Sequence, residues 1–169
     1  PYIFCVGADI TAMPLLTERE QALELGRYGH KVFRKLKDST VPTFAFINGA
    51  AMGGGLEVAL HCHYRSIATT AVVAFPEVFL GLVPGWGGSQ LLPNLIGVPG
   101  AAQVILQNPL TQKTLRPKQA AELGLADQLF EPADFLERSL EWAAAVVAGD
   151  VTVERPEIDR DRWEGVLFF

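Results

Sequence analysis

Residues 48–60 of the chain read "NGAAMGGGLEVAL", and this stretch decides the fold because three consecutive glycines join a buried strand to a helix. Glycine loses more backbone entropy on folding than any other residue, so three in a row cost more than a structural turn requires. A strand, a glycine loop and a helix leave unbonded N–H groups at a positive helix terminus. The stretch therefore predicts that a ligand lies against this backbone and places an anion or oxyanion there.

The glycine loop does not match the common phosphate-binding motifs. It lacks G-x-G-x-x-G in a dinucleotide-binding context, and no Gly-Lys-Ser/Thr ends it, which excludes a Walker A loop. Taken alone, Gly53 to Gly55 are equally consistent with a tight packing turn between strand and helix. The residues around the loop favour the functional interpretation.

Two glutamates accompany the loop. Glu57 falls in the first turn of the predicted helix, where a carboxylate also compensates the helix dipole. Glu77 lies in "AFPEVFLGLVPGWGG", residues 74–88, between an apolar strand and a second glycine-rich loop. Apolar neighbours predict partial burial, which raises a glutamate pKa towards the range useful for proton transfer, although a strand-end cap is the alternative. Together the two carboxylates predict an acid/base site.

A second turn supplies another candidate donor. In "FCVGADI", residues 4–10, a strand runs into Gly7, and Ala8 then presents its N–H much as Gly54 does. Charge that develops on the carbonyl oxygen of a thioester or amide is stabilised best by two donors that converge on it from separate loops. Ala8 and Gly54 are therefore the predicted oxyanion hole.

Length and composition indicate one ordinary soluble domain. The chain has 169 residues, of which 49% are hydrophobic and 20% charged, with a net charge of −5. The acidic balance gives no support for nucleic-acid binding, and the basic cluster at 31–37 is typical of a solvated helix face. Cys5 and Cys62 do not form a disulfide framework, so a reducing cytoplasm fits best. Neither a signal peptide nor a membrane-spanning segment is present in the sequence.

Hydrophobic periodicity predicts alternating strands and helices, and therefore the α/β class. The predicted strands are 2–6, 43–48, 64–69 and 71–75. The predicted helices lie within 17–39, directly after the glycine loop, at 100–106, at 116–123 and within 132–149. Residues 81–97 are so rich in glycine and proline that we expect a loop with at most a short helix at 91–96. Beyond Gly149 the composition becomes charged, which predicts a linker or an ordered extension.

These motifs resemble the enoyl-CoA hydratase/isomerase family, the crotonases. "FCVGADI", "NGAAMGGGLEVAL", "FPEVFLGLVPGWGGSQLLPNLIG" and "KQAAELGLAD" occur in the order and at the spacing of that family, over residues 3 to about 148. The resemblance implies a crotonase-type spiral of ββα units over residues 1–148, with the N-terminal strands of the domain absent from this chain. Residues 149–169 are then a linker, similar to one that leads to a dehydrogenase domain.

The resemblance also implies an activity and a site. The expected reaction is hydration of a trans-2-enoyl-CoA in fatty-acid β-oxidation, a syn-type addition of water, with coenzyme A thioester as substrate and no cofactor or metal. Glu57 and Glu77 are the implied catalytic residues, and the peptide N–H groups of Ala8 and Gly54 hold the thioester oxygen. Contacts to CoA or the acyl chain are implied for Ala8, Asp9, Ile10, Thr11, Gly53, Gly54, Pro76 and Trp86.

Some residues depart from the family pattern or have a simpler interpretation. Trp86 and the run Ser89-Gln90-Leu91 stand where many members have Ala and Thr-Gln-Arg, so Trp86 either packs or contacts the acyl chain. His61 and His63 are two apart, so they do not face each other on a helix and a shared metal ion is not expected.

Three functions remain open from sequence. A hydratase uses both glutamates, an isomerase of the same fold often keeps only the second, and a scaffold binds acyl-CoA without turnover. The resemblance implies an acyl-CoA partner, no nucleic acid or membrane, and either a trimer-based homo-oligomer or fusion to a 3-hydroxyacyl-CoA dehydrogenase domain.

Overall fold

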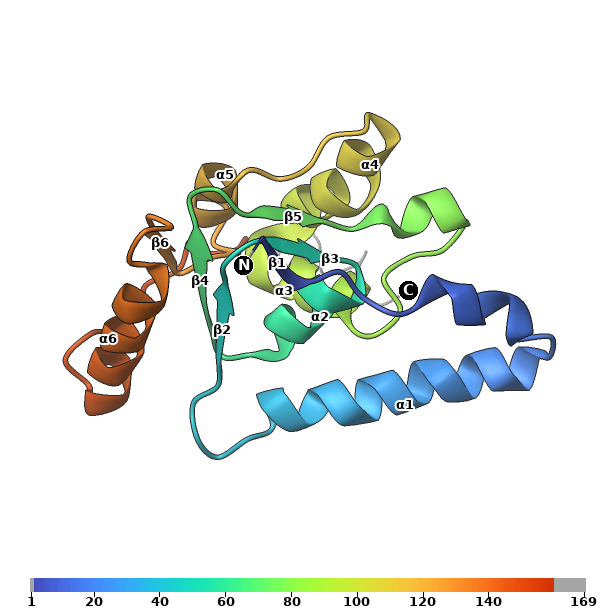
Figure 1. Ribbon diagram of the computed structural model, residues 1–169, viewed down its shortest axis with the longest axis horizontal. Coiled ribbons are helices and arrows are strands. Elements are labelled where there is room, and N and C mark those ends of the chain that lie inside the picture. Colours follow the sequence, from blue (N-terminus) through green and yellow to red (C-terminus); the bar gives the residue numbers. More distant parts are fainter. Residues whose placement is uncertain (1, 160–169) are drawn as a thin grey trace.

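The computed structural model describes residues 2–159, and within them two three-stranded parallel sheets carry the fold (Figure 1). One sheet has the order β1-β3-β5 and the other β2-β4-β6. Their strands are β1 (Ile3–Cys5), β2 (Phe44–Ile47), β3 (Ala50–Met52), β4 (Tyr64–Ala68), β5 (Val72–Ala74) and β6 (Gln128–Phe130).

The chain alternates between the two sheets. β2 and β3 lead into helix α2 (Gly54–His61), and β4 and β5 lead through the 3-10 helix η2 (Pro76–Leu80) into α3 (Gly88–Ala102). Each passage adds one strand to each sheet in parallel, so Phe44 pairs with Tyr64 and Ala50 pairs with Val72. This repetition is the spiral of ββα units that the family resemblance implies.

The remaining helices surround this spiral. They are the 3-10 helix η1 (Ile10–Leu15), α1 (Arg19–Lys37), the π-helical turn η3 (Gln103–Gln107), α4 (Asn108–Leu110), α5 (Pro117–Glu122) and α6 (Phe135–Ala148). Helix α6 packs on β2 and β6, and α1 packs on α2 (Figure 1). The core between these layers contains buried residues from both sheets and from α2 and α3, among them Ile47, Leu56, Ile67, Phe75 and Leu92.

The glycine- and proline-rich segment forms more helix than the sequence predicts. The expected short helix at 91–96 in fact begins at Gly88 and continues to Ala102. Its backbone leaves the helical region at Gly97, where φ is 78°. Pro99 then lies in the first turn after this break, where its missing N–H has no intrahelical partner to lose. Proline therefore marks a restart of the helix here, not a loop.

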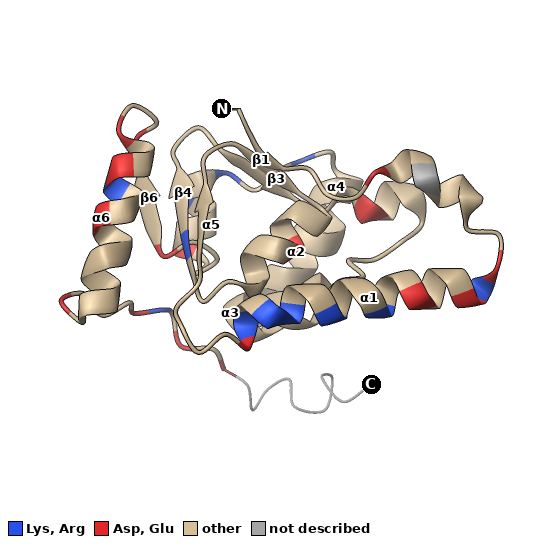
Figure 2. Ribbon diagram, turned by 60° about the horizontal axis from the view of Figure 1, so that its bottom comes forward, with Lys and Arg blue, Asp and Glu red and all other residues tan. Residues whose placement is uncertain are grey.

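Two further features concern surface charge and membrane contact. The basic side chains at 31–37 lie exposed along the last turns of α1, as expected for a solvated helix face (Figure 2). Over residues 2–159, no helix is both long enough and apolar enough to cross a bilayer.

Candidate active site

The two predicted oxyanion donors lie on adjoining loops. Gly53 precedes α2 with a φ of 53°, and its N–H donates to the Ala74 carbonyl at 3.0 Å, which fixes the loop to β5. Gly54 is the first residue of α2, so its N–H has no acceptor within the helix. The other loop turns at Gly7, where φ is 95°, and a Cβ there would be 3.1 Å from the Gly54 nitrogen. Only glycine fits this approach, and it brings the Ala8 turn beside Gly54.

Glu57 is held rigidly at the centre of the site. Its side chain comes from the first turn of α2 and the residue is only 2% exposed. The Oε1 atom accepts hydrogen bonds from the backbone N–H of Trp86 at 2.7 Å and of Gly88 at 2.9 Å. Burial raises the pKa of Glu57, while the two amides and the charge of His30 oppose that shift. Both of these hydrogen bonds go to Oε1, and a ligand contact of the Glu57 carboxylate remains a prediction.

The two amides that orient Glu57 were not predicted from sequence. They lie in the second glycine-rich loop, at the start of α3. A signal is present in the sequence, since the pair Gly87-Gly88 begins a helix as the pair Gly53-Gly54 does, and helix starts offer unbonded N–H groups. The density of glycine and proline in 81–97 favours a loop, so this signal alone does not identify the two amides as donors.

Glu77 lies beside the Gly53–Gly55 loop. It lies in η2, and its Oε1 would be 3.0 Å from a Cβ on Gly53. Its Oε2 is buried and has no hydrogen-bond partner among the described residues. Burial, reinforced by the charge of Glu57, raises the pKa of Glu77 to about 7. A carboxyl group with that pKa exchanges protons readily near neutral pH.

The raised pKa of Glu77 predicts a dependence of stability on pH. The folded-state pKa is about 7 against an ordinary value of 4.5, so the folded protein binds this proton more tightly. The stability that Glu77 contributes is therefore fully present below pH 4.5 and is lost as pH rises through about 7. We expect the free energy of unfolding in urea to fall between pH 5 and pH 8 by more in the parent than in Glu77→Gln. Equal changes in the two proteins contradict the shift.

Trp86 forms one wall of the site and also anchors α1. Its ring atoms would be 2.8 Å from a Cβ on Gly54 and 2.2 Å from one on Gly29 of α1, so both glycines make room for the indole. The indole Nε1 donates to the Leu25 carbonyl at 3.3 Å, and the ring meets Phe33 edge to face. Trp86 thus packs between α1 and the head of α2, while contact with an acyl chain remains a prediction.

Pro76 borders a hollow beside Glu77. The hollow has a volume of about 330 Å³ and is lined mainly by apolar groups: Met52, Ala74, Phe75, Pro76, Phe79, Pro109, Gln112, Lys113 and Thr114. Two of the lining residues, Met52 and Pro76, directly precede Gly53 and Glu77 in the chain. An apolar ligand chain fits such a lining.

The predicted CoA-binding turn is exposed. Asp9 Oδ1 accepts from the Thr11 N–H at 2.9 Å and from the Thr11 hydroxyl at 2.6 Å, which caps η1. Ile10 is 57% exposed between them. The turn follows Ala8 directly in the chain, and its contact with CoA remains a prediction.

The two histidines have separate structural contacts. His61 Nδ1 lies 2.8 Å from the Glu57 carbonyl oxygen, whereas His63 Nδ1 lies 2.8 Å from the Thr43 hydroxyl. Among residues 2–159, no three His, Cys, Asp or Glu side chains gather as a metal site.

Comparison with known proteins relates this geometry to a family. A sequence profile described as "Enoyl-CoA hydratase/isomerase" matches residues 1–154. The fatty acid oxidation complex subunit alpha of Shewanella amazonensis is 43% identical over 144 residues, which are 84% of this chain and 20% of that protein. The same subunit of Shewanella loihica is 40% identical over 157 residues, which are 92% of this chain and 21% of that protein. The chain spans about a fifth of the length of these curated relatives.

Solved structures agree. The enoyl-CoA hydratase of Bacillus anthracis superposes with a TM-score of 0.75 at 31% identity, over 86% of this chain and 54% of that one. The enoyl-CoA hydratase of Thermoplasma volcanium superposes with a TM-score of 0.77 at 27% identity, over 88% of this chain and 56% of that one. The spiral of ββα units and the crotonase fold expected from sequence are confirmed. The match over residues 1–154 shows that the chain belongs to the enoyl-CoA hydratase/isomerase family.

Proposed function

We propose that the chain hydrates trans-2-enoyl-CoA thioesters. The observation that carries this proposal is the Glu77 carboxyl group, whose pKa is raised to about 7 and whose buried Oε2 has no hydrogen-bond partner among residues 2–159. This group lies against Gly53, which precedes the helix that carries Glu57. An acid/base pair beside two oxyanion donors suits a reaction that moves a proton next to a thioester carbonyl.

The proposed mechanism starts at the thioester oxygen. This oxygen accepts hydrogen bonds from the N–H groups of Ala8 and Gly54, which stabilise an enolate and make the β-carbon electrophilic. A water held between Glu57 and Glu77 adds its oxygen to the β-carbon. Glu77 gives its proton to the α-carbon, and the proton that the water loses restores the carboxyl pair. No cofactor is needed, because the amides stabilise the charge and the carboxyl groups move the protons.

Isomerisation of an enoyl-CoA is the second candidate. The backbone N–H groups of Trp86 and Gly88 both donate to Glu57 Oε1, so one oxygen of this carboxylate already has a structural role. An isomerase moves one proton between two carbons and needs only one carboxyl group, for which Glu77 suffices. Product analysis by liquid chromatography and mass spectrometry distinguishes the two, because hydration of a trans-2-enoyl-CoA adds the mass of one water and isomerisation of a 3-enoyl-CoA leaves the mass unchanged.

Glu57→Gln tests which candidate holds. Glutamine keeps an oxygen that accepts from the Trp86 and Gly88 amides but cannot take a proton, so the loop is preserved while base function is lost. We expect hydration to fall about 10²-fold, and isomerisation to fall less than that. Glu137→Gln, on the exposed face of α6, is the matched control. Unchanged hydration by Glu57→Gln contradicts the two-carboxyl mechanism and favours the isomerase.

The proposal extends to substrate, partners and compartment. The apolar hollow beside Glu77 is the proposed place for the acyl chain. The similarity to subunits of fatty acid oxidation complexes supports a role in β-oxidation, with the hydrated product passed to a 3-hydroxyacyl-CoA dehydrogenase domain fused to this one or to a partner in an oligomer. Free cysteines at 5 and 62 suit a reducing cytoplasm.

A further inference from the structure

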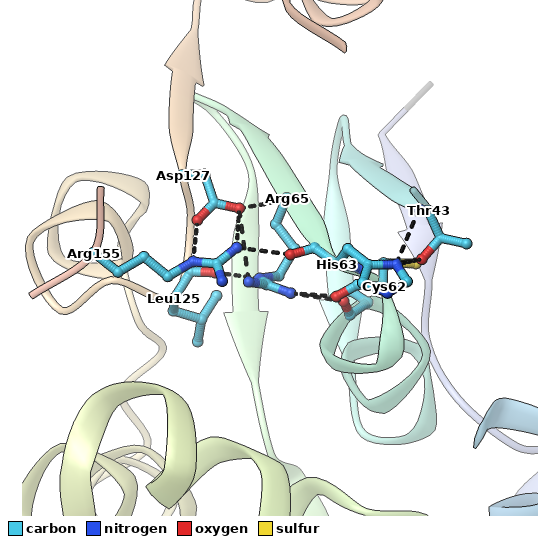
Figure 3. Close-up of polar contacts among 8 residues, drawn as sticks. Thr43, Cys62, His63, Arg65, Leu125, Asp127 and Arg155 are labelled. Atoms are coloured by element: carbon cyan, nitrogen blue, oxygen red, sulfur yellow. Dashed lines mark hydrogen bonds and ion pairs between the residues drawn. The ribbon is translucent and has the colours of Figure 1, made fainter. Parts of the chain in front are cut away.

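A buried group of charged side chains lies at the end of α2 that points away from the active site (Figure 3). Arg65 on β4 and Asp127 before β6 have side chains that are 2% and 0% exposed, and Arg155 reaches them from the segment after α6. Asp127 Oδ1 accepts from Arg155 Nε at 2.6 Å, and Asp127 Oδ2 accepts from the Arg65 backbone N–H at 2.7 Å. One carboxylate thus joins two arginines from distant parts of the chain.

The Arg65 guanidinium binds the carboxyl end of α2. Its Nη1 donates to the Cys62 carbonyl at 2.7 Å and, more weakly, to the Ala59 carbonyl at 3.5 Å, while its Nε donates to the Leu125 carbonyl at 2.7 Å. The Cys62 carbonyl belongs to the C-cap of α2, where a helix end leaves carbonyls without intrahelical partners. A cation is also favoured by the negative end of the helix dipole. Arg65 therefore caps α2 and ties it to the chain before β6.

The turn between α2 and β4 is held on its other side as well. Arg155 Nη2 donates to the His63 carbonyl at 2.7 Å, and His63 Nδ1 lies 3.1 Å from the Thr43 nitrogen (Figure 3). The end of α2 is thus fixed by β2, by β4 and by the segment that carries Arg155. A helix of eight residues is about 12 Å long, so its two ends move together.

We propose that Arg65 is a positioning residue for the reaction at the opposite end of α2, an inference that rests on the proposed function. The amino end of this helix presents the Gly54 N–H and the Glu57 carboxylate. By fixing the carboxyl end, Arg65, with Asp127 and Arg155, sets where these two groups meet the thioester. Displacements of about 1 Å at reacting groups are enough to cost about 10²-fold in rate.

The test compares Arg65→Lys and Arg155→Gln with the parent. Lysine keeps the charge but lacks the planar fork that reaches several carbonyls at once. Arg155→Gln is the milder change, because the Arg155 side chain is 33% exposed. If Arg65→Lys does not fold, Arg155→Gln alone tests the positioning role. Arg34→Lys is the matched control, since Arg34 pairs with Asp38 on the surface and its side chain is 74% exposed.

Two readouts separate positioning from general stability. One is kcat and KM for hydration, and the other is the absorption band of bound 4-dimethylaminocinnamoyl-CoA, which moves to longer wavelength as its thioester carbonyl is polarised. We expect Arg65→Lys to lower kcat about tenfold with a smaller change in KM, and to reduce the band shift. Arg155→Gln should act in the same direction, and Arg34→Lys should match the parent.

Lower melting temperatures with parental kcat and band shift in both variants overturn the proposal. Failure of the proposed function is visible in the parent itself. A parent that shifts the band without hydrating the enoyl-CoA overturns hydration, and its band still tests the positioning by Arg65. A parent that neither shifts the band nor turns over overturns both.

Discussion

Replacing Glu77 with glutamine is expected to lower the hydration rate by about 10²- to 10⁴-fold, the range that positioned acid/base groups contribute. Glu77 has the raised pKa of about 7, and glutamine matches its shape without a transferable proton. The fall should appear in kcat, because the proton moves in the transition state, while CoA thioester binding changes little.

Glu57→Gln is the comparison variant for Glu77→Gln. Glu57→Gln should lose less activity than Glu77→Gln, because Glu57 Oε1 is occupied by two backbone amides. Thermal unfolding of each variant at pH 7 is the measurement that checks whether the fold is kept. A Glu77→Gln protein that folds and retains more than a tenth of the parental rate contradicts the assignment of Glu77 as the acid.

Gly54→Ala is expected to reduce the rate by about 10²- to 10³-fold, as removal of an oxyanion donor does elsewhere. The new Cβ would lie 2.8 Å from a Trp86 ring carbon, so either the ring or the head of α2 must shift. The ring is held by the Leu25 carbonyl and by Phe33, and the Trp86 N–H holds Glu57. The displacement therefore reaches the Gly54 N–H or the Glu57 carboxylate.

Two further variants identify the clash as the cause. Gly26→Ala in helix α1 is the control, because a Cβ there has no atom within 4 Å. In the double variant Gly54→Ala with Trp86→Leu, the ring carbons that clash are absent, and part of the rate should return. A double variant as slow as Gly54→Ala alone contradicts the steric explanation.

The sequence predicted α2 and its glycine loop because their chemistry is local. Three glycines, a first-turn carboxylate and an apolar stripe identify a helix terminus without reference to the rest of the chain. The oxyanion pair followed from the requirement for two converging donors, and the structure brings the Ala8 turn to the Gly54 amide. Helix α2 and its glycine loop are confirmed, because these motifs determine their own backbone, whereas the role of Ala8 and Gly54 as an oxyanion hole remains a prediction.

Features that depend on tertiary contacts were missed. β3 consists of Ala50, Ala51 and Met52, which have little strand propensity, and it is a strand because it pairs between β1 and β5. The short strand β6 pairs with β4 across more than 60 residues of chain. No local signal predicts that Arg65, Asp127 and Arg155 meet, because they belong to three separate segments.

The boundary at Gly149 remains a prediction in part. Residues 160–169 of the predicted linker lie outside the described residues, whereas residues 150–159 follow α6 without regular secondary structure. Within that segment, Arg155 binds Asp127 and lies over the Tyr64 ring. These contacts join Arg155 to the domain, and the assignment of residues 149–169 as a linker or an ordered extension remains a prediction.

The most direct test of the two-carboxyl hydratase mechanism is the loss of conjugated-enone absorbance when the full-length natural protein meets a short trans-2-enoyl-CoA. Glu57→Gln and Glu77→Gln are assayed beside it, with CoA thioester binding measured on the same samples. The mechanism predicts that the parent turns over and that both variants bind the thioester but lose most of the rate. A parent that binds the thioester and leaves the absorbance unchanged contradicts it.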